Sequence, residues 1–249
     1  MPYEPAIRVE ELSKEFTVIL EPPLTLQKGL YNFVYGKNNS LRLWALREVN
    51  FLVSKGEALG IIGANASGKT TLLRIIAGIY QPTRGKIFSS GKIAVSLELG
   101  AGFILEFTGR ENLYLYGAIF GLTRRDTALK IPQIQEFSEL GDFLDAPLRQ
   151  YSVGMRMRLA FSFAVNFAAD ILLVDEMLAV GDTAFRRKCL DKLKEVKKQG
   201  TTLLLVSHRP EEVAEVCTRA IMLHKGSIHL QGNVSEVLSA YESMQGAVK

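Results

Sequence analysis

The sequence is poor in cysteine, lacks a long uninterrupted apolar run and carries little excess charge of either sign. Its two cysteines, Cys189 and Cys217, stand outside any CxxC or Cys/His cluster, which argues against a disulfide framework and against a zinc site. The most apolar long window, residues 159–180, contains three carboxylic residues and an asparagine, too many polar groups for a membrane span. Since the first residues also lack the basic-then-apolar order of a signal peptide, we expect a cytoplasmic chain.

The composition is that of an ordinary globular protein. With 249 residues, 47% apolar and 22% charged, the chain is long enough to bury a substantial core. Its 30 Lys and Arg residues against 26 Asp and Glu give a net charge of +4, a mild basic excess that suits an anionic surface without indicating a nucleic-acid-binding protein. Because no internal repeat stands out, we expect one domain over residues 1–249.

The amino-terminal part predicts two strands with an unusual connection. Residues 6–16 and the alternating Val49, Phe51 and Val53 are typical of half-buried strands. The stretch between them, residues 17–42, mixes proline, glycine and asparagine with aromatic residues, which predicts an irregular insertion around one short helix. We expect this insertion either to contact the headgroup phosphates of a membrane or of a lipid-linked substrate, or to be a plain solvated flap.

The rest of the chain predicts a parallel sheet. Short continuous apolar runs at residues 59–62, 171–174 and 203–206 each lead into a turn and then a helical stretch, as strands buried on both faces do. Strands that alternate with helices form a mainly parallel sheet, with binding chemistry at the carboxyl ends of the strands. The fold class is therefore α/β.

Helix starts are marked by capping-box spacing. The pairs are Thr108 with Glu111, Thr123 with Asp126, and Asn233 with Glu236. Most of the region 109–168 reads as helix, and it stands between residues expected in the sheet. We expect it to form a helical subdomain inserted between strands.

A phosphate-binding loop directly follows the run 59–62. It reads Gly63-Ala64-Asn65-Ala66-Ser67-Gly68-Lys69-Thr70 and continues into the helical stretch that opens with Thr71. The strand before it and the helix after it are the context that this GxxxxGKT motif requires. The glycines allow backbone N–H groups and the positive end of the helix to reach a polyphosphate. Lys69 adds a charge for the β- and γ-phosphates, and Thr70 offers a hydroxyl to Mg²⁺.

Two other apolar runs end in side chains that suit the same chemistry. The run 171–174 ends in Asp175-Glu176: we expect Asp175 to hold Mg²⁺ through water and Glu176 to activate the water that attacks the γ-phosphate of ATP. The run 203–206 leads to Ser207-His208, where the imidazole of His208 can contact the γ-phosphate.

A further segment narrows the choice among phosphate-loop families. It reads Tyr151-Ser152-Val153-Gly154-Met155 and lies one helix ahead of the run 171–174. It resembles the signature sequence of ABC ATPases, usually Leu-Ser-Gly-Gly-Gln, in the form typical of exporters of O-antigen, capsule and teichoic-acid chains. Supporting matches are Glu98-Leu99-Gly100, residues 108–112 and 158–161, and Ala179-Val180-Gly181-Asp182 in the D-loop position. The resemblance runs from about residue 8 to 232.

The resemblance implies an architecture and a set of partners. It predicts a P-loop NTPase of the ABC type with a mainly parallel core sheet, an antiparallel β portion, and a signature-bearing helical subdomain at about residues 98–168. Two copies sandwich two ATP molecules, the signature of one facing the phosphate loop of the other. The homodimer lies at the cytoplasmic face of the bacterial inner membrane and serves a separate integral membrane subunit, which moves a lipid-linked glycan.

The membrane subunit is thus expected in two copies, and no nucleic acid is expected as a partner. Some exporters that resemble this sequence carry an additional carbohydrate-binding domain, whereas the sequence here ends at Lys249 and corresponds to the short form. We therefore expect the choice of substrate to lie mostly with the membrane subunit. The helical stretch at residues 98–125, with Phe103, Phe107, Tyr114, Tyr116 and Phe120, is the expected dock, although at helical spacing most such aromatic residues belong to a core.

The signature has a physical basis of its own and departs from the family pattern. Ser152 and Gly154 stand at the start of a helix predicted from Met155 to about residue 167, where a hydroxyl and free N–H groups suit a γ-phosphate. Val153 replaces a glycine, so the backbone there should avoid positive φ. Met155 replaces a glutamine, and Glu98 lies nearest to the usual loop glutamine. Slower or differently coupled hydrolysis is one expected consequence.

Two aromatic residues compete for the adenine ring. Trp44 precedes the expected strand 45–53, and Phe16 has the usual spacing after the first strand. An aromatic ring stacked on the base is expected in either case, and we favour Trp44. Two other classes of protein stay open: a soluble ABC protein of translation or DNA maintenance, and a phosphate-loop enzyme such as a nucleotide kinase, which would have no use for the signature.

Overall fold

Two β-sheets form the centre of the protein. The computed structural model describes residues 4–19, 40–95, 102–166, 169–175 and 183–246. The smaller sheet is antiparallel, in the order β2-β1-β4, and consists of β1 (Ile7–Ile19), β2 (Ser40–Val53) and β4 (Arg84–Ser89). The larger sheet has the order β5-β6-β7-β3-β8-β9 and consists of β5 (Ile93–Val95), β6 (Ile171–Val174), β7 (Thr202–Val206), β3 (Ala58–Ile62), β8 (Arg219–His224) and β9 (Ser227–Asn233).

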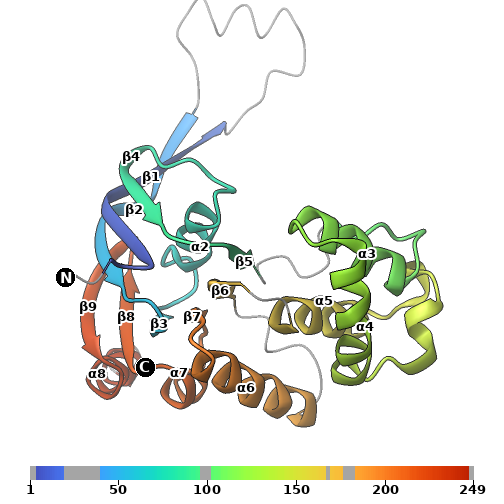
Figure 1. Cartoon of the computed structure of the whole chain (residues 1–249). Helices are drawn as coiled ribbons and strands as arrows, with labels where there is room; N and C mark the ends of the chain where they lie inside the picture. Colours follow the sequence, from blue (N-terminus) through green and yellow to red (C-terminus); the bar gives the residue numbers. More distant parts are fainter. Residues whose placement is uncertain (1–3, 20–39, 96–101, 167–168, 176–182, 247–249) are drawn as a thin grey trace, which may run out of the picture.

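The larger sheet is parallel except at one edge, where β9 runs antiparallel to β8. Helices lie on its two faces and to one side (Figure 1). They are α2 (Lys69–Ile76), α3 (Gly109–Ile119), α4 (Arg124–Ser138), α5 (Val153–Asn166), α6 (Thr183–Lys198), α7 (Pro210–Val216) and α8 (Val234–Gly246), with 3₁₀ turns η1 (Gly141–Asp145) and η2 (Leu148–Gln150). The expected α/β fold with a mainly parallel sheet and an antiparallel portion is confirmed.

The continuous apolar runs explain why the central strands are buried on both faces. In β6, Leu172 and Val174 belong to the core shared with α6, α7 and α8, whereas Ile171 and Leu173 belong to the core shared with α2 and the antiparallel sheet. Successive side chains of a strand point to opposite faces, so a strand between two cores must be apolar at every position. The same alternation holds in β7.

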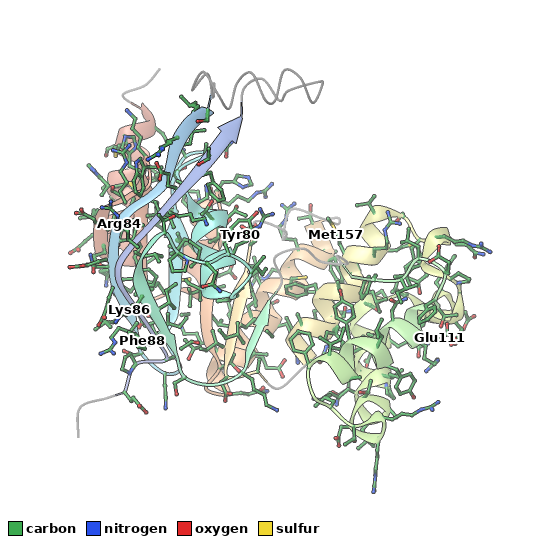
Figure 2. All side chains as sticks on the ribbon, turned by 90° about the horizontal axis from the view of Figure 1, so that it is seen from above. Tyr80, Arg84, Lys86, Phe88, Glu111 and Met157 are labelled. Carbon is green, nitrogen blue, oxygen red and sulfur yellow. The ribbon has the colours of Figure 1, made fainter. Side chains whose placement is uncertain are left out.

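The helices α3, α4 and α5 have a core of their own and lie beside the sheets (Figure 1). Figure 2 shows Glu111 and Met157 on this helical side, and Arg84, Lys86 and Phe88 on the side of the sheets. Helices α3 and α4 begin with the capping boxes that the sequence predicts. At α3, the Thr108 side chain accepts from the N–H of Glu111, and the N–H of Thr108 donates to the carboxylate of Glu111. A cap of this kind stabilises a helix by about 1 kcal/mol.

Several predicted boundaries were wrong. Residues 17–19 and 40–42 lie in β1 and β2, where they pair with one another, so the irregular insertion predicted over residues 17–42 begins later and ends earlier, and its remainder lies outside the described residues. Trp44 lies inside β2 rather than ahead of a strand. By contrast, the helix start predicted at Asn233 is confirmed, because α8 begins at the next residue and the side chain of Asn233 accepts from the N–H of Ser235.

Two further expectations from the sequence concern the cysteines and a membrane-spanning segment. Both cysteines are free and buried, and burial raises the pKa of each thiol to about 12. In the part of the chain that the structure describes, no helix combines the length and the apolar character needed to cross a bilayer.

Candidate functional site

Three segments singled out in the sequence meet at one edge of the larger sheet. The loop of residues 63–70 follows β3, Asp175 follows β6, and His208 follows β7. Because β6 pairs with β7 and β7 pairs with β3, all in parallel, the carboxyl ends of these strands are neighbours. This edge is where open α/β sheets bind their ligands.

Two glycines fix the path of the loop. Gly63 has φ +154°, and a Cβ atom there would lie 2.3 Å from the carbonyl oxygen of Leu223 and 2.6 Å from Ser67 Oγ. Gly68 has φ +105°, and a Cβ atom there would lie 2.5 Å from the carbonyl oxygen of Ala45. Side chains do not fit at such distances, and L residues rarely adopt these φ values. The loop can therefore fold closely onto its neighbours only with glycine at both positions.

Lys69 holds its charge inside the loop. Its side chain is 5% exposed, and Nζ donates to the carbonyl oxygens of Gly63 at 2.9 Å and Ala64 at 3.1 Å. A buried ammonium needs such acceptors because burial removes its hydration. The two carbonyl groups keep the cation at the loop, where a polyphosphate would meet it.

Further features of the loop suit an anion. Ser67 is 4% exposed, and its Oγ has no hydrogen-bond partner among the described residues. Within the same part of the chain, no side chain caps the amino end of α2, and the first turn, which includes Thr70 and Thr71, has no acidic residue. The exposed residues of the loop are Ala64, Asn65 and Ala66. A helix amino end with unused donors is a ready site for phosphate, so the residues fit the triphosphate that the sequence predicts.

The two other strand ends differ in exposure. Asp175 is 7% exposed, which suits a carboxylate that faces a cation. His208 is exposed, while the preceding Ser207 is buried. The imidazole thus stands at the surface of the site and the serine below it. Three other predicted site residues, Glu98, Glu176 and Asp182, lie outside the described residues.

The signature segment lies at the start of α5, in the helical region. Tyr151 is buried, its hydroxyl donates to the carbonyl oxygen of Phe143, and burial raises the pKa of Tyr151 to about 12. Ser152 is exposed, and its Oγ accepts from the N–H of Met155 at 3.1 Å. The serine therefore caps α5 as predicted, while its hydroxyl hydrogen stays available to another acceptor.

Helix α5 starts two residues earlier than predicted, because Val153 and Gly154 already belong to it. The backbone at Val153 is helical, so the expectation that it avoids positive φ is confirmed. Val153 is 59% exposed. An ideal Cβ atom on Gly154 would meet only Ser152 Oγ, at 3.8 Å, which leaves the surface open around this glycine.

The two candidates for adenine contact lie on the ribbon of β1 and β2. Phe16 is half-buried against Tyr80, with ring centroids 5.6 Å apart. Trp44 is half-buried near the guanidinium group of Arg84, 5.7 Å from its ring. Trp44 directly precedes Ala45, whose carbonyl group borders Gly68 in the phosphate loop.

The aromatic residues expected at the dock divide between core and surface. Phe103 is buried against Tyr116, with centroids 4.8 Å apart, and Phe120 packs on Phe163. Phe107 is 41% exposed. A groove of about 460 Å³ is lined by Phe107, Glu111, Tyr114, Leu115, Ala118, Leu122 and Arg124. Most of the aromatic side chains are therefore core, and the groove is the part of this region open to a partner.

Sequence reasoning missed two residues that border the site. The N–H of Gly226, in the turn between β8 and β9, donates to the carbonyl oxygen of Ser67 at 3.0 Å. Glu212 in α7 accepts from Ser207 Oγ at 2.6 Å. An acidic residue four positions after His208 was a signal in the sequence, whereas nothing local marked the contact of Gly226.

Comparisons with known proteins agree with this geometry. Residues 46–179 match the family described as "ABC transporter". The chain is 37% identical to the O-antigen export system ATP-binding protein RfbB of Klebsiella pneumoniae, over 96% of this chain and 98% of that protein. It is 42% identical to the ABC transporter protein AbcA of Aeromonas salmonicida, over 97% of this chain and 77% of that protein. It is also 42% identical to the teichoic acids export ATP-binding protein TagH of Bacillus cereus, over 80% of this chain and 36% of that protein.

Solved structures agree in fold. A dimeric bacterial ABC transporter cassette has a TM-score of 0.74 at 20% identity and covers 92% of this chain and 98% of its own. An ATP-binding subunit of an ABC transporter has a TM-score of 0.76 at 22% identity, with 95% and 93% covered. The resemblance expected from the sequence is confirmed. The chain belongs to the ABC transporter family and has the fold of its ATP-binding cassettes.

Proposed function

We propose that this chain is the ATP-hydrolysing subunit of an ABC transporter that exports a lipid-linked polysaccharide, such as an O-antigen, a capsule or a teichoic acid, across the cytoplasmic membrane. One observation carries the hydrolytic part: the loop of residues 63–70, Asp175 and His208 lie at the ends of three adjacent parallel strands. The relatives named for O-antigen and teichoic-acid export support the choice of cargo.

The proposed roles of the site residues follow from their chemistry. Lys69 and the N–H groups of the loop bind the β- and γ-phosphates of ATP. Thr70 and Asp175 hold Mg²⁺, the latter through water; the ion, when bound, neutralises charge on the phosphates. Glu176 orients the attacking water and takes its proton. His208 contacts the γ-phosphate.

We propose that a second copy of the chain completes each site. The exposed Ser152 and the open surface at Gly154 leave a hydroxyl and helix N–H groups available to the γ-phosphate bound by the partner. Val153, Met155 and Asp182 complete this contact surface. A two-fold dimer buries the same surface on both copies, and hydrolysis then removes the contacts that ATP supplied to the closed state.

For the adenine ring we propose Trp44, since its neighbour Ala45 borders the phosphate loop. Trp44→Ala should weaken ATP binding about fivefold to tenfold, the loss of one aromatic contact of about 1 kcal/mol or slightly more. Phe16→Ala, which removes the packing on Tyr80, is the comparison variant. Titration of a fluorescent ATP analogue measures both. Weaker binding in Phe16→Ala alone would move the assignment to Phe16.

We propose that the helical region docks on an integral membrane subunit, which places the chain peripherally at the cytoplasmic face of the inner membrane. The fully buried Asn112 exchanges hydrogen bonds with the backbone of Ile104, N–H to Oδ1 at 2.8 Å and Nδ2 to O at 3.0 Å. It thereby holds a loop on which Leu105 and Phe107 are exposed. Exposed apolar side chains beside a groove are typical of an interaction surface.

Purification of the chain with its membrane subunit tests the proposal. The complex should contain two copies of each subunit and should hydrolyse ATP, and mass spectrometry should find a lipid-linked glycan bound to the membrane subunit. In vesicles, ATP should drive that glycan across the bilayer. Recovery of a ribosomal or DNA-bound partner instead would refute export in favour of a non-transport ABC ATPase.

A further inference from the structure

The carboxylate of Glu212 is buried directly beneath the turn that carries His208. Glu212 lies in the first turn of α7 and is 6% exposed. Its Oε2 accepts from Ser207 Oγ at 2.6 Å, and its Oε1 has no hydrogen-bond partner among the described residues. A buried carboxylate oxygen without a partner costs free energy, so an apolar residue would suit stability better at this position.

The hydrogen bond to Ser207 reaches the backbone on the far side of His208. Ser207 is 2% exposed, and its Oγ also accepts from the N–H of Arg209 at 3.1 Å. The serine hydroxyl therefore has one fixed orientation, donating to Glu212 and accepting from Arg209. His208 lies between Ser207 and Arg209 in the chain, and the Ser207 hydroxyl bonds to the N–H of Arg209. The backbone of His208 is therefore held on both sides.

Helix α7 is itself firmly placed, which makes Glu212 a fixed support. An ideal Cβ atom on Gly60 of β3 would lie 2.3 Å from Val213 Cγ1, so α7 packs directly on the strand that leads to the phosphate loop. On its other side, Glu215 of α7 pairs with Arg187 and Lys194 of α6. The position of Glu212 is thus set by the same strand that positions the loop.

We propose that Glu212 is a positioning residue: through Ser207 it fixes the turn that presents the imidazole of His208 to the γ-phosphate. This inference rests on the proposed function, in which His208 makes that contact. The loss of the hydrogen bond between Ser207 and Glu212 acts on hydrolysis only as far as it lets His208 move. Nucleotide binding by the loop does not depend on it.

Kinetics of the complex with its membrane subunit test the role. Glu212→Ala should lower kcat for ATP hydrolysis about tenfold or more, in line with one lost charged hydrogen bond, and should change KM and the Kd for ATP less than about twofold. Glu212→Gln keeps an acceptor for Ser207 and should restore most of kcat. Ser207→Ala removes the same bond from the other side and should reproduce the loss. Glu211→Ala, at the exposed neighbouring position, is the matched control and should behave as wild type.

The coupling to His208 separates positioning from a general structural effect. In a His208→Ala background, Glu212→Ala should cause no further loss of kcat, because the group it positions is gone. An equal loss in both backgrounds would overturn the inference, as would full activity of a folded Glu212→Ala protein.

A measurement that does not depend on ATP hydrolysis keeps this inference distinct from the proposed function. The chain has three histidines, and ¹³C-labelled imidazoles resolve them by NMR. In the full chain, Glu212→Ala should shift the His208 resonance and leave those of His224 and His229 in place. An unshifted His208 resonance contradicts positioning even if ATP hydrolysis is confirmed, and a shifted one supports it even if the cargo proves different.

Discussion

Replacing Lys69 with alanine should lower the rate of ATP hydrolysis about 10²- to 10³-fold, the usual cost of removing one preorganised group that stabilises charge in a transition state. Lys69 is buried in the loop with its Nζ on two carbonyl oxygens, so its substitution removes a charge that is held in place at the loop. Steady-state hydrolysis by the complex with the membrane subunit measures the effect.

The matched control for this substitution is Lys198→Ala. Lys198 is exposed in the last turn of α6, so its removal deletes the same charge from the chain without touching the loop. It should leave hydrolysis within about twofold of wild type, since exposed charges contribute little. Similar activities in the two variants, both folded, would exclude Lys69 from the site.

The second large effect is expected from Gly154→Asp. The space around Gly154 is open within its own chain, and a carboxylate near the amino end of α5 is favourable to that helix by about 0.3–1 kcal/mol. The fold should therefore keep its thermal stability. In the dimer, however, the new charge would face the phosphates bound by the partner, and hydrolysis should fall at least about 100-fold.

Dimerisation gives this prediction its decisive measurement. In the presence of MgATP and the membrane subunit, Glu176→Gln should bind ATP without hydrolysing it and should hold the two copies together. Adding Gly154→Asp to that protein should separate them. Light scattering and crosslinking report the difference. If the combined variant stays dimeric with ATP bound, the signature does not contact the partner's nucleotide.

Continuous apolar runs and local polar signals made much of the fold predictable. The three runs became β3, β6 and β7 because only strands between two cores need apolar residues at every position. Thr108 and Thr123 became helix caps because their partners are three residues away, within reach of local rules. The loop of residues 63–70 was predictable because its two glycines, its lysine and its threonine all lie within one short stretch of the sequence.

The rest depended on contacts between distant parts of the chain. Residues 17–19 and 40–42 extend β1 and β2 because the two segments pair with each other, although residues 17–19 are also β-branched and suit a strand locally. Glu212 stands four residues after His208 in the sequence, but only the placement of α7 brings its carboxylate to Ser207 Oγ. Pairing and burial of this kind are set by the tertiary structure, which a single sequence does not display.

The hydrogen bond from Gly226 to Ser67 extends the nucleotide-binding unit far beyond its motifs. Gly226 also accepts from the N–H of Arg47 at 2.8 Å, so a hairpin near the carboxyl end of the chain joins the loop to β2. A protein truncated after α7 would retain every recognisable motif, yet its loop would lose the hydrogen bond from Gly226. Engineered fragments and fusions of this cassette should therefore preserve the hairpin of β8 and β9 intact.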